Sequence, residues 1–153
     1  MKPAFKKDAA LLEDIQAARA KGESGLWWLG QSGFLALRNG RALVLDPYLS
    51  DSLTYKYANT DKPHVRITER VIHPAALGSL GIIDVITTSH NHTDHLDPET
   101  LVLLLAANPH AKLVAPAANR DFVLGRLGPA LENRFIGVND DAPVRIGSIE
   151  INP

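Results

Sequence analysis

Apolar residues recur at helical spacing near the start of this chain. They are Leu11, Leu12, Ile15 and Ala18. This spacing predicts an amphipathic helix over residues 8–21, because side chains three and four positions apart share one face of a helix. Gly22 follows at the position where a helix often ends, since glycine adopts the left-handed conformation of a C-terminal cap easily.

Shorter apolar runs follow and predict a sheet. Three of them, at residues 26–29, 34–37 and 42–45, are separated by turn residues and read as strands. Asn39-Gly40, between the second and third runs, is a strong hairpin signal. Residues 46–74 then break the pattern with proline, tyrosine, asparagine and charged residues. A segment of that length without periodicity is typical of a functional loop.

Strands and helices alternate from residue 82 onward. Residues 82–87 form the continuous β-branched run of a buried strand, and Pro98 suits the first turn of a helix over residues 99–107. The other predicted elements are a strand at 112–115, a helix at 119–127, a strand at 134–138 and a hairpin at 142–152. The order predicts an α/β fold, a layered α+β arrangement with helices packed on a sheet.

Composition narrows the class of protein. The chain has 153 residues, enough for one domain with its own core, and its formal net charge of -1 gives no field that favours nucleic acid or anionic membranes. Without cysteine it forms no disulfide, and it can hold a metal only through histidine, carboxylate, carbonyl or water. The N-terminus lacks the apolar stretch of a signal peptide, and the apolar run 101–107 is too short to cross a bilayer. We therefore expect a cytoplasmic protein.

The stretch "SHNHTDHLD", residues 89–97, contains three of the six histidines. It directly follows the predicted buried strand, and ligands gather beyond the carboxyl ends of strands in α/β sheets. His90 and His92 share one side of an extended chain, while Asp94 and His95 can turn toward a neighbouring ion. Imidazole and carboxylate together suit a divalent metal. The alternative is a polar turn, and Asp97 before Pro98 is expected to cap the next helix in either case.

"HNHTDH" resembles the HxHxDH signature of the metallo-β-lactamase superfamily. The segments "WWLGQSGFLAL", "LVLDPYLSDSL", "KYANTDKPHVRI" and "IDVITTSHNHTDHLD" resemble, in order, the branch that contains L-ascorbate 6-phosphate lactonase, from about Leu26 onward. The resemblance implies the N-terminal half of the superfamily's αββα sandwich over residues 1–153. Residues 1–22 would form a helical extension within that domain.

The resemblance also implies roles for individual residues. His90 and His92 would bind one metal ion, and Asp94 and His95 a second, with Mn or Zn as the ions. A hydroxide on the metal would attack a lactone carbonyl or a phosphorus centre, and Asp94 would also act in catalysis by orienting water or passing on a proton. Asp46 matches an acidic residue that supports the site from below, although it also suits an ordinary turn at a strand end. Histidine rather than glutamate at position 92 favours hydrolysis over di-iron redox chemistry.

The implied substrate is a small molecule, a phosphorylated sugar-acid lactone. Lys56, His64 and Arg66 in the long segment are candidates for binding its phosphate, although each also suits a solvated surface. We expect no membrane partner, do not favour nucleic acid, and allow for a homo-oligomer. A phosphodiesterase or nuclease of the same superfamily is the alternative enzyme.

The motif supplies fewer ligands than two metal ions need. Two ions take about six first-shell positions, whereas the motif offers four and nothing after His110 is histidine. We therefore expect residues 1–153 to represent a truncated domain, the first half of a family member. A non-catalytic half-domain is the competing hypothesis. In that case Leu35, Val44, Ile83 and Val85 would expose part of an apolar sheet face.

Overall fold

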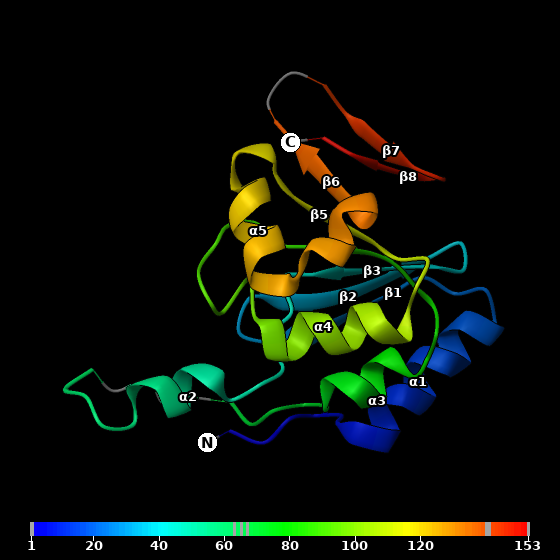
Figure 1. Ribbon diagram of the computed structural model, residues 1–153. Helices are drawn as coiled ribbons and strands as arrows, with labels where there is room; N and C mark the ends of the chain where they lie inside the picture. The colour runs from blue at the N-terminus through cyan, green and yellow to red at the C-terminus, as the bar shows by residue number, and fades with distance from the viewer. Residues whose placement is uncertain (1, 63, 65, 67, 140–141, 153) are drawn as a thin grey trace.

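A six-stranded mixed sheet organises the chain (Figure 1). The computed structural model describes residues 2–62, 64, 66, 68–139 and 142–152. The strands are β1 (Gly25–Gly30), β2 (Gly33–Arg38), β3 (Arg41–Leu45), β4 (Ile83–Thr87), β5 (Lys112–Pro116) and β6 (Phe135–Val138), hydrogen-bonded in that order. β1, β2 and β3 pair antiparallel, whereas β3, β4, β5 and β6 pair parallel. The carboxyl ends of β1 and of β3 to β6 therefore meet at one edge.

The first hairpin turns follow from the residues that form them. Asn39 and Gly40 have φ values of 51° and 73°, the left-handed conformation that a two-residue turn between β2 and β3 requires at both positions. Gln31, in the turn between β1 and β2, also has a positive φ of 51°. That turn lies at the same edge of the sheet as the carboxyl ends of β3 and β4, which places Ser32 beside them.

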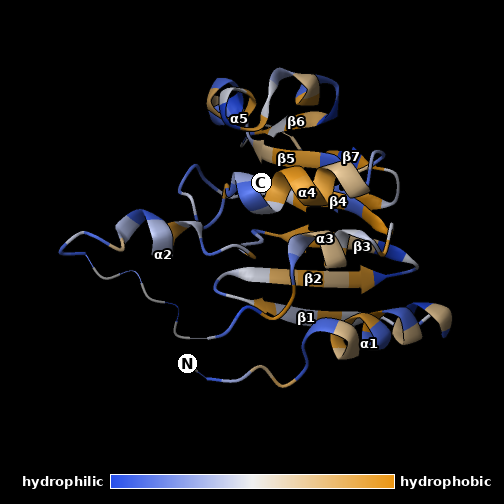
Figure 2. Cartoon of the chain, turned by 60° about the horizontal axis from the view of Figure 1, so that its bottom comes forward, coloured by the Kyte–Doolittle hydropathy of each residue, from blue (hydrophilic) through white to orange (hydrophobic). Residues whose placement is uncertain are grey.

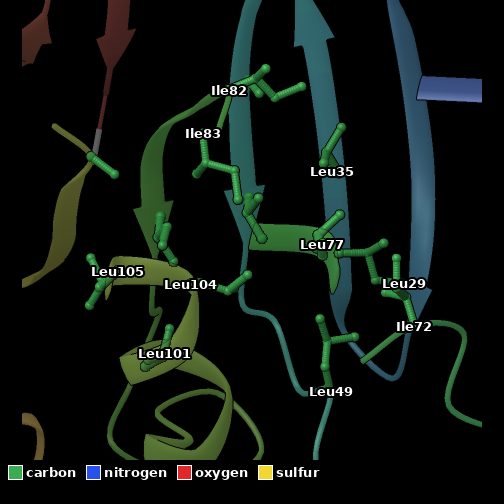
Figure 3. Close-up of a cluster of buried hydrophobic side chains, with 14 of the residues drawn as sticks. Leu29, Leu35, Leu49, Ile72, Leu77, Ile82, Ile83, Leu101, Leu104 and Leu105 are labelled. Carbon is green, nitrogen blue, oxygen red and sulfur yellow. The ribbon is translucent and has the colours of Figure 1, made fainter. Parts of the chain in front are cut away.

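Helices cover one face of the sheet. α1 (Asp8–Ala20), α3 (Pro74–Gly78) and α4 (Pro98–Ala107) lie on that face in Figure 1. Buried side chains from the helices and the inward positions of the strands form one apolar cluster, part of which Figure 3 shows; it includes Ile15, Leu29, Leu35, Val44, Leu77, Ile83, Leu101 and Leu104. Most of α4 is hydrophobic, whereas α2 (Ser52–Tyr57) is more polar (Figure 2). Removing apolar surface from water stabilises the folded chain by about 25 cal/mol per Å². The buried side chains of α4 therefore hold this helix against the strands.

The remaining elements complete the second half of the chain. Along the chain, α5 (Arg120–Leu127) follows β5 and precedes β6. Short 3-10 helices at Ala117–Asn119 and Pro129–Arg134 flank it. β7 (Val144–Ile146) and β8 (Ile149–Ile151) form a separate two-stranded sheet. The mixed α/β architecture that the sequence predicts is confirmed. Among the helices of the described part of the chain, none has both the length and the apolar character needed to span a lipid bilayer.

The apolar positions expected to be exposed are instead buried. Leu35, Val44, Ile83 and Val85 are each 0% exposed. The exposed apolar side chains of the sheet are those of Leu26 and Trp28 in the edge strand β1, at 66% and 53%. Side chains alternate between the two faces of a strand, so β1 buries Leu29 among the helices and leaves Leu26 and Trp28 on the opposite face. The prediction that these four side chains would be exposed is therefore wrong.

Candidate active site

The histidine loop, residues 89–97, is anchored at both of its ends. Thr88, just after β4, donates its backbone N–H to Val114 O at 2.9 Å and its hydroxyl to His90 O at 2.9 Å. At the other end Leu96 is 0% exposed, and its N–H bonds to His92 O at 2.7 Å. The loop therefore leaves the sheet edge, makes a tight turn and returns to the core within a few residues.

Asp97 links this loop to two helices. Its carboxylate accepts hydrogen bonds from the N–H of Thr100 at 3.1 Å and from the Thr100 hydroxyl at 2.5 Å, so it caps α4 as predicted. It also accepts a bond from the hydroxyl of Ser52, the first residue of α2, at 3.1 Å. Asp97 is 0% exposed, and these three bonds compensate for the loss of water around its carboxylate.

The structure brings the four predicted metal ligands together. The ring centroids of His90 and His92 lie 4.5 Å apart, and those of His90 and His95 lie 4.0 Å apart. His95 Nε2 lies 3.7 Å from Asp94 Oδ2. The His90 ring is slightly closer to His95 than to His92, and His95 lies beside Asp94. The division of the four residues into two pairs, one for each metal ion, remains a prediction. Over the residues that the structure describes, no three histidine, aspartate or glutamate side chains are already arranged to hold a metal ion.

Asp46 lies beneath this cluster, directly after β3. Its Oδ2 is 2.7 Å from His95 Nδ1 and bonds the Ser89 hydroxyl, while its Oδ1 accepts the Ser89 N–H at 2.8 Å. Its φ of 40° is unusual for a residue other than glycine, although aspartate tolerates it better than most. Non-glycine residues in this conformation concentrate at functional sites. The contacts put Asp46 in a position to orient His95 and the start of the histidine loop.

The donors fit a divalent cation in kind, and the contact with Asp46 orients one of them, His95, as a ligand. An ionised carboxylate only accepts hydrogen bonds, so the contact with Asp46 requires the proton of His95 on Nδ1 and leaves Nε2 free as a ligand. Metal-binding histidines commonly donate their second ring N–H to a carboxylate in this way. Two ligands bonded at about 2.1 Å in a tetrahedral site lie about 3.4 Å apart. The 3.7 Å between His95 Nε2 and Asp94 Oδ2 is close to that separation.

A cavity of about 520 Å³ opens beside the histidine loop. One wall carries Asn91, His92, Thr93 and Asp94 from the loop, together with Arg126 from α5; the other carries Leu53, Lys56 and Tyr57 from α2, together with Lys62 and His64. Lys56 and His64, predicted as substrate-binding residues, therefore line the same cavity as two of the predicted ligands. The His64 and Tyr57 rings stack with centroids 5.7 Å apart, which orders that wall.

Arg66, the third predicted substrate-binding residue, lies outside this cavity. Its side chain is 8% exposed and donates to Tyr48 O at 2.8 Å. It also lies 3.3 Å from Asp51 Oδ1 and 5.0 Å from the centroid of the Tyr48 ring. A guanidinium held from three directions inside the protein packs the segment before α2, and Arg66 is not among the residues that line the cavity.

Sequence reasoning missed Lys62 and Arg126, both of which line the cavity. Lys62 is a cation in the same long segment as Lys56, so it could have been predicted as a phosphate-binding residue for the same reason. Arg126 lies in a predicted helix more than thirty residues after Asn91 and Thr93 of the histidine loop. No local pattern links it to the loop, because only the packing of α5 beside the carboxyl ends of the strands brings it there.

Comparison with known proteins identifies the family of this chain. Residues 25–144 match the sequence model of the family described as the beta-lactamase superfamily domain. This chain belongs to the beta-lactamase superfamily. The match covers β1 through the histidine loop to the first residue of β7. The superfamily predicted from the sequence is therefore confirmed, while its ascorbate 6-phosphate lactonase branch remains a prediction.

Several curated proteins that are similar to this chain have names that describe hydrolytic enzymes. A metal-dependent hydrolase of Hyperthermus butylicus is 30% identical over 124 residues, which is 81% of this chain and 45% of that protein. A metal-dependent hydrolase of a Polaromonas species is 35% identical over 133 residues, 83% of this chain and 41% of that protein. The mitochondrial N-acyl-phosphatidylethanolamine-hydrolyzing phospholipase D of Saccharomyces cerevisiae is 39% identical over 74 residues, 48% of this chain and 14% of that protein. The chain spans less than half the length of each of these relatives.

Solved structures share the fold. CmlA, a diiron beta-hydroxylase from Streptomyces venezuelae, superposes with a TM-score of 0.55 at 24% identity, covering 84% of this chain and 23% of that one. The apo state of the chemotaxis sensor ODP from T. denticola gives a TM-score of 0.52 at 19% identity, covering 82% of this chain and 46% of that one. At these identities the likeness shows the superfamily fold alone.

Proposed function

We propose that this chain carries the metal-binding loop and part of the substrate cavity of a metal-dependent hydrolase. The observation that carries the proposal is that one cavity is lined by His92 and Asp94 together with Lys56, Lys62 and Arg126. Two relatives named as metal-dependent hydrolases cover more than four fifths of the chain, which supports the same chemistry.

The chain's own residues would divide the work between them. His90, His92 and His95 would hold one or two divalent ions, Mn or Zn, together with Asp94. Such an ion supplies a bound water whose pKa is lowered toward about 7, and a Lewis acid for the substrate oxygen. Asp94 is half-buried beside His95 and can hold or pass on a proton at its free carboxylate oxygen. Asp46 would keep His95 in the tautomer that presents Nε2.

The cavity favours an anionic substrate. Lys56, Lys62 and Arg126 line it, while Asp94 is the one carboxylate among the described residues that do so. Cationic side chains in this setting suit a phosphate group, which they bind through charge-assisted hydrogen bonds. A lactone ester requires only a polarised carbonyl and an activated water, and neither step needs a protein nucleophile. We therefore propose a phosphorylated sugar-acid lactone as substrate, in line with the branch that the sequence resembles.

Phosphodiester hydrolysis is the second candidate. The similarity at 39% identity to a protein named as a phospholipase D favours it. The same cations would bind the phosphate of a diester instead of a phosphate distant from the reacting bond.

A substrate panel separates the two reactions. The full-length protein that contains these residues, stripped of metal and then supplied with Mn²⁺ or Zn²⁺, would be assayed against a phosphorylated lactone, the same lactone without phosphate and a nitrophenyl phosphodiester. We expect metal-dependent opening of the phosphorylated lactone, with kcat/KM at least tenfold higher than for the lactone without phosphate. Faster cleavage of the phosphodiester would select the second candidate. Failure to bind metal at all would refute both.

A further inference from the structure

Arg126 of α5 joins the histidine loop to a separate helix. Its Nη2 donates to Thr93 Oγ1 at 2.7 Å, and its Nη1 donates to Asn91 O at 3.4 Å, a longer and weaker bond. Asn91 and Thr93 flank His92 in the sequence. One guanidinium therefore holds both neighbours of a predicted metal ligand.

This contact lies between the two anchored ends of the loop. Thr88 ties the start of the loop to β5, and buried Leu96 ties its end to the core. His92 lies between these points and is exposed. A histidine on an exposed turn loses rotational and backbone freedom when it binds a metal, and a tether on both sides reduces that cost beforehand.

The guanidinium is itself held in place. Val123 and Leu124 are buried and fix α5 against the core, and Arg126 projects from the same helix four residues after Phe122. The centre of its guanidinium lies 5.8 Å from the centroid of the Phe122 ring. Arginine suits this task because its planar fork presents several donors in a fixed geometry, which a lysine ammonium cannot reproduce.

We propose that Arg126 is a positioning residue that sets the geometry of His92 through Asn91 and Thr93, so that metal affinity of the histidine loop depends on α5. The inference rests on the proposed metal-binding function of that loop. Groups that orient metal ligands typically change metal affinity by 10- to 100-fold when they are removed. Because Arg126 acts on His92 through its neighbours, we expect its loss to weaken metal binding by about tenfold, at the lower end of that range.

Co²⁺ provides the test, because its visible absorption reports coordination geometry as well as occupancy. The full chain would be titrated with Co²⁺ in the wild-type form and as Arg126→Ala, Arg126→Lys and Thr93→Val. Arg120→Ala is the matched control, since Arg120 lies on the same helix and pairs with Asp121 and Glu132 instead of the loop. Thr93→Val removes the hydroxyl acceptor with little change of shape and decides the question even if Arg126→Ala misfolds.

We expect Arg126→Ala to weaken Co²⁺ binding about tenfold and to alter the absorption spectrum, Thr93→Val to weaken it severalfold, and Arg126→Lys to restore only part of the affinity. The double variant Arg126→Ala with Thr93→Val should bind no more weakly than Arg126→Ala. Arg120→Ala should match the wild type. Wild-type binding with Arg126→Ala or Thr93→Val unchanged in affinity and spectrum would overturn this inference alone. A wild-type chain that binds no Co²⁺ would overturn the proposed function together with it.

Discussion

Replacing Asp46 by asparagine tests how the site prepares His95. His95 Nδ1 lies 2.7 Å from the aspartate, and when it donates to that carboxylate the neutral imidazole has Nε2 without a proton and able to bind a metal. Asparagine has nearly the same shape and also tolerates the positive φ of 40° at this position. Its amide oxygen can still accept the Ser89 N–H, so its amide NH₂ group would face His95 and donate to Nδ1. The proton of His95 would then move to Nε2, the atom that should bind the metal.

The expected cost is a loss of metal affinity with little loss of folding. Removing a group that orients a metal ligand costs about 10- to 100-fold in affinity, or about 1.4 to 2.7 kcal/mol at about 1.4 kcal/mol per factor of ten. Because the backbone and one of the hydrogen bonds with Ser89 survive, we expect the free energy of unfolding of the metal-free chain to change by about 1 kcal/mol at most. Titration with Zn²⁺ would measure the affinity, and the ¹⁵N shifts of the His95 ring would report its tautomer.

Asp121→Asn provides the control, since Asp121 has a 96% exposed side chain and pairs with Arg120. This variant makes the same chemical change and should leave both quantities as they are in the wild type. An Asp46→Asn protein that keeps the wild-type tautomer and binds Zn²⁺ within twofold of the wild type would refute the reasoning.

Three further predictions concern single side chains. His92→Ala should reduce metal content and hydrolysis together, whereas His110→Ala should change neither; equal metal content in the two variants would exclude His92 as a ligand. Asp97→Ala should lower the free energy of unfolding in urea by about 1.5 to 3 kcal/mol, because it leaves buried donors without their charged partner. The hydrogen bond from Lys7, followed by that from the Ala4 N–H, lowers the pKa of Glu69, so its stabilisation is present above the ordinary pKa of about 4.5 and is lost as the pH falls through the lowered value. Glu69→Gln should therefore flatten the acid side of the stability profile, and an unchanged profile would contradict this assignment.

Periodicity predicted most of the fold, and it failed where elements were short. The helix predicted at residues 8–21 corresponds to α1 at Asp8–Ala20, and the Asn39-Gly40 turn joins β2 to β3 as expected. In the segment 46–74 the sequence showed no pattern, yet α2 forms within it at Ser52–Tyr57. A helix of six residues makes fewer than two turns, too few for apolar spacing to repeat. Tertiary contacts stabilise it, since Leu53 is buried and its N–H bonds Tyr48 Oη at 3.0 Å.

The residues of the candidate site could be predicted only where they lie close together in the sequence. His90, His92, Asp94 and His95 lie in one motif, and the strand before them fixes where the motif sits. Neither Arg66 nor Arg126 carries a sequence signal for its role, but the fold buries one against Tyr48 and turns the other toward Thr93. Such a choice depends on contacts between residues far apart in the chain, which neither composition nor spacing records.

Because of the hydrogen bonds of Asp97, the cavity exists only in the folded chain. They fasten α2 to the start of α4, and the histidine loop ends at the same residue, so both walls of the cavity are assembled only when α4 has docked. A compound that touches both walls therefore has no equivalent site in the unfolded chain. It must raise the melting temperature by mass action, with about 2.7 kcal/mol of added stability at a concentration one hundred times its dissociation constant. Thermal denaturation can thus rank candidate metals and phosphorylated compounds before any reaction has been detected.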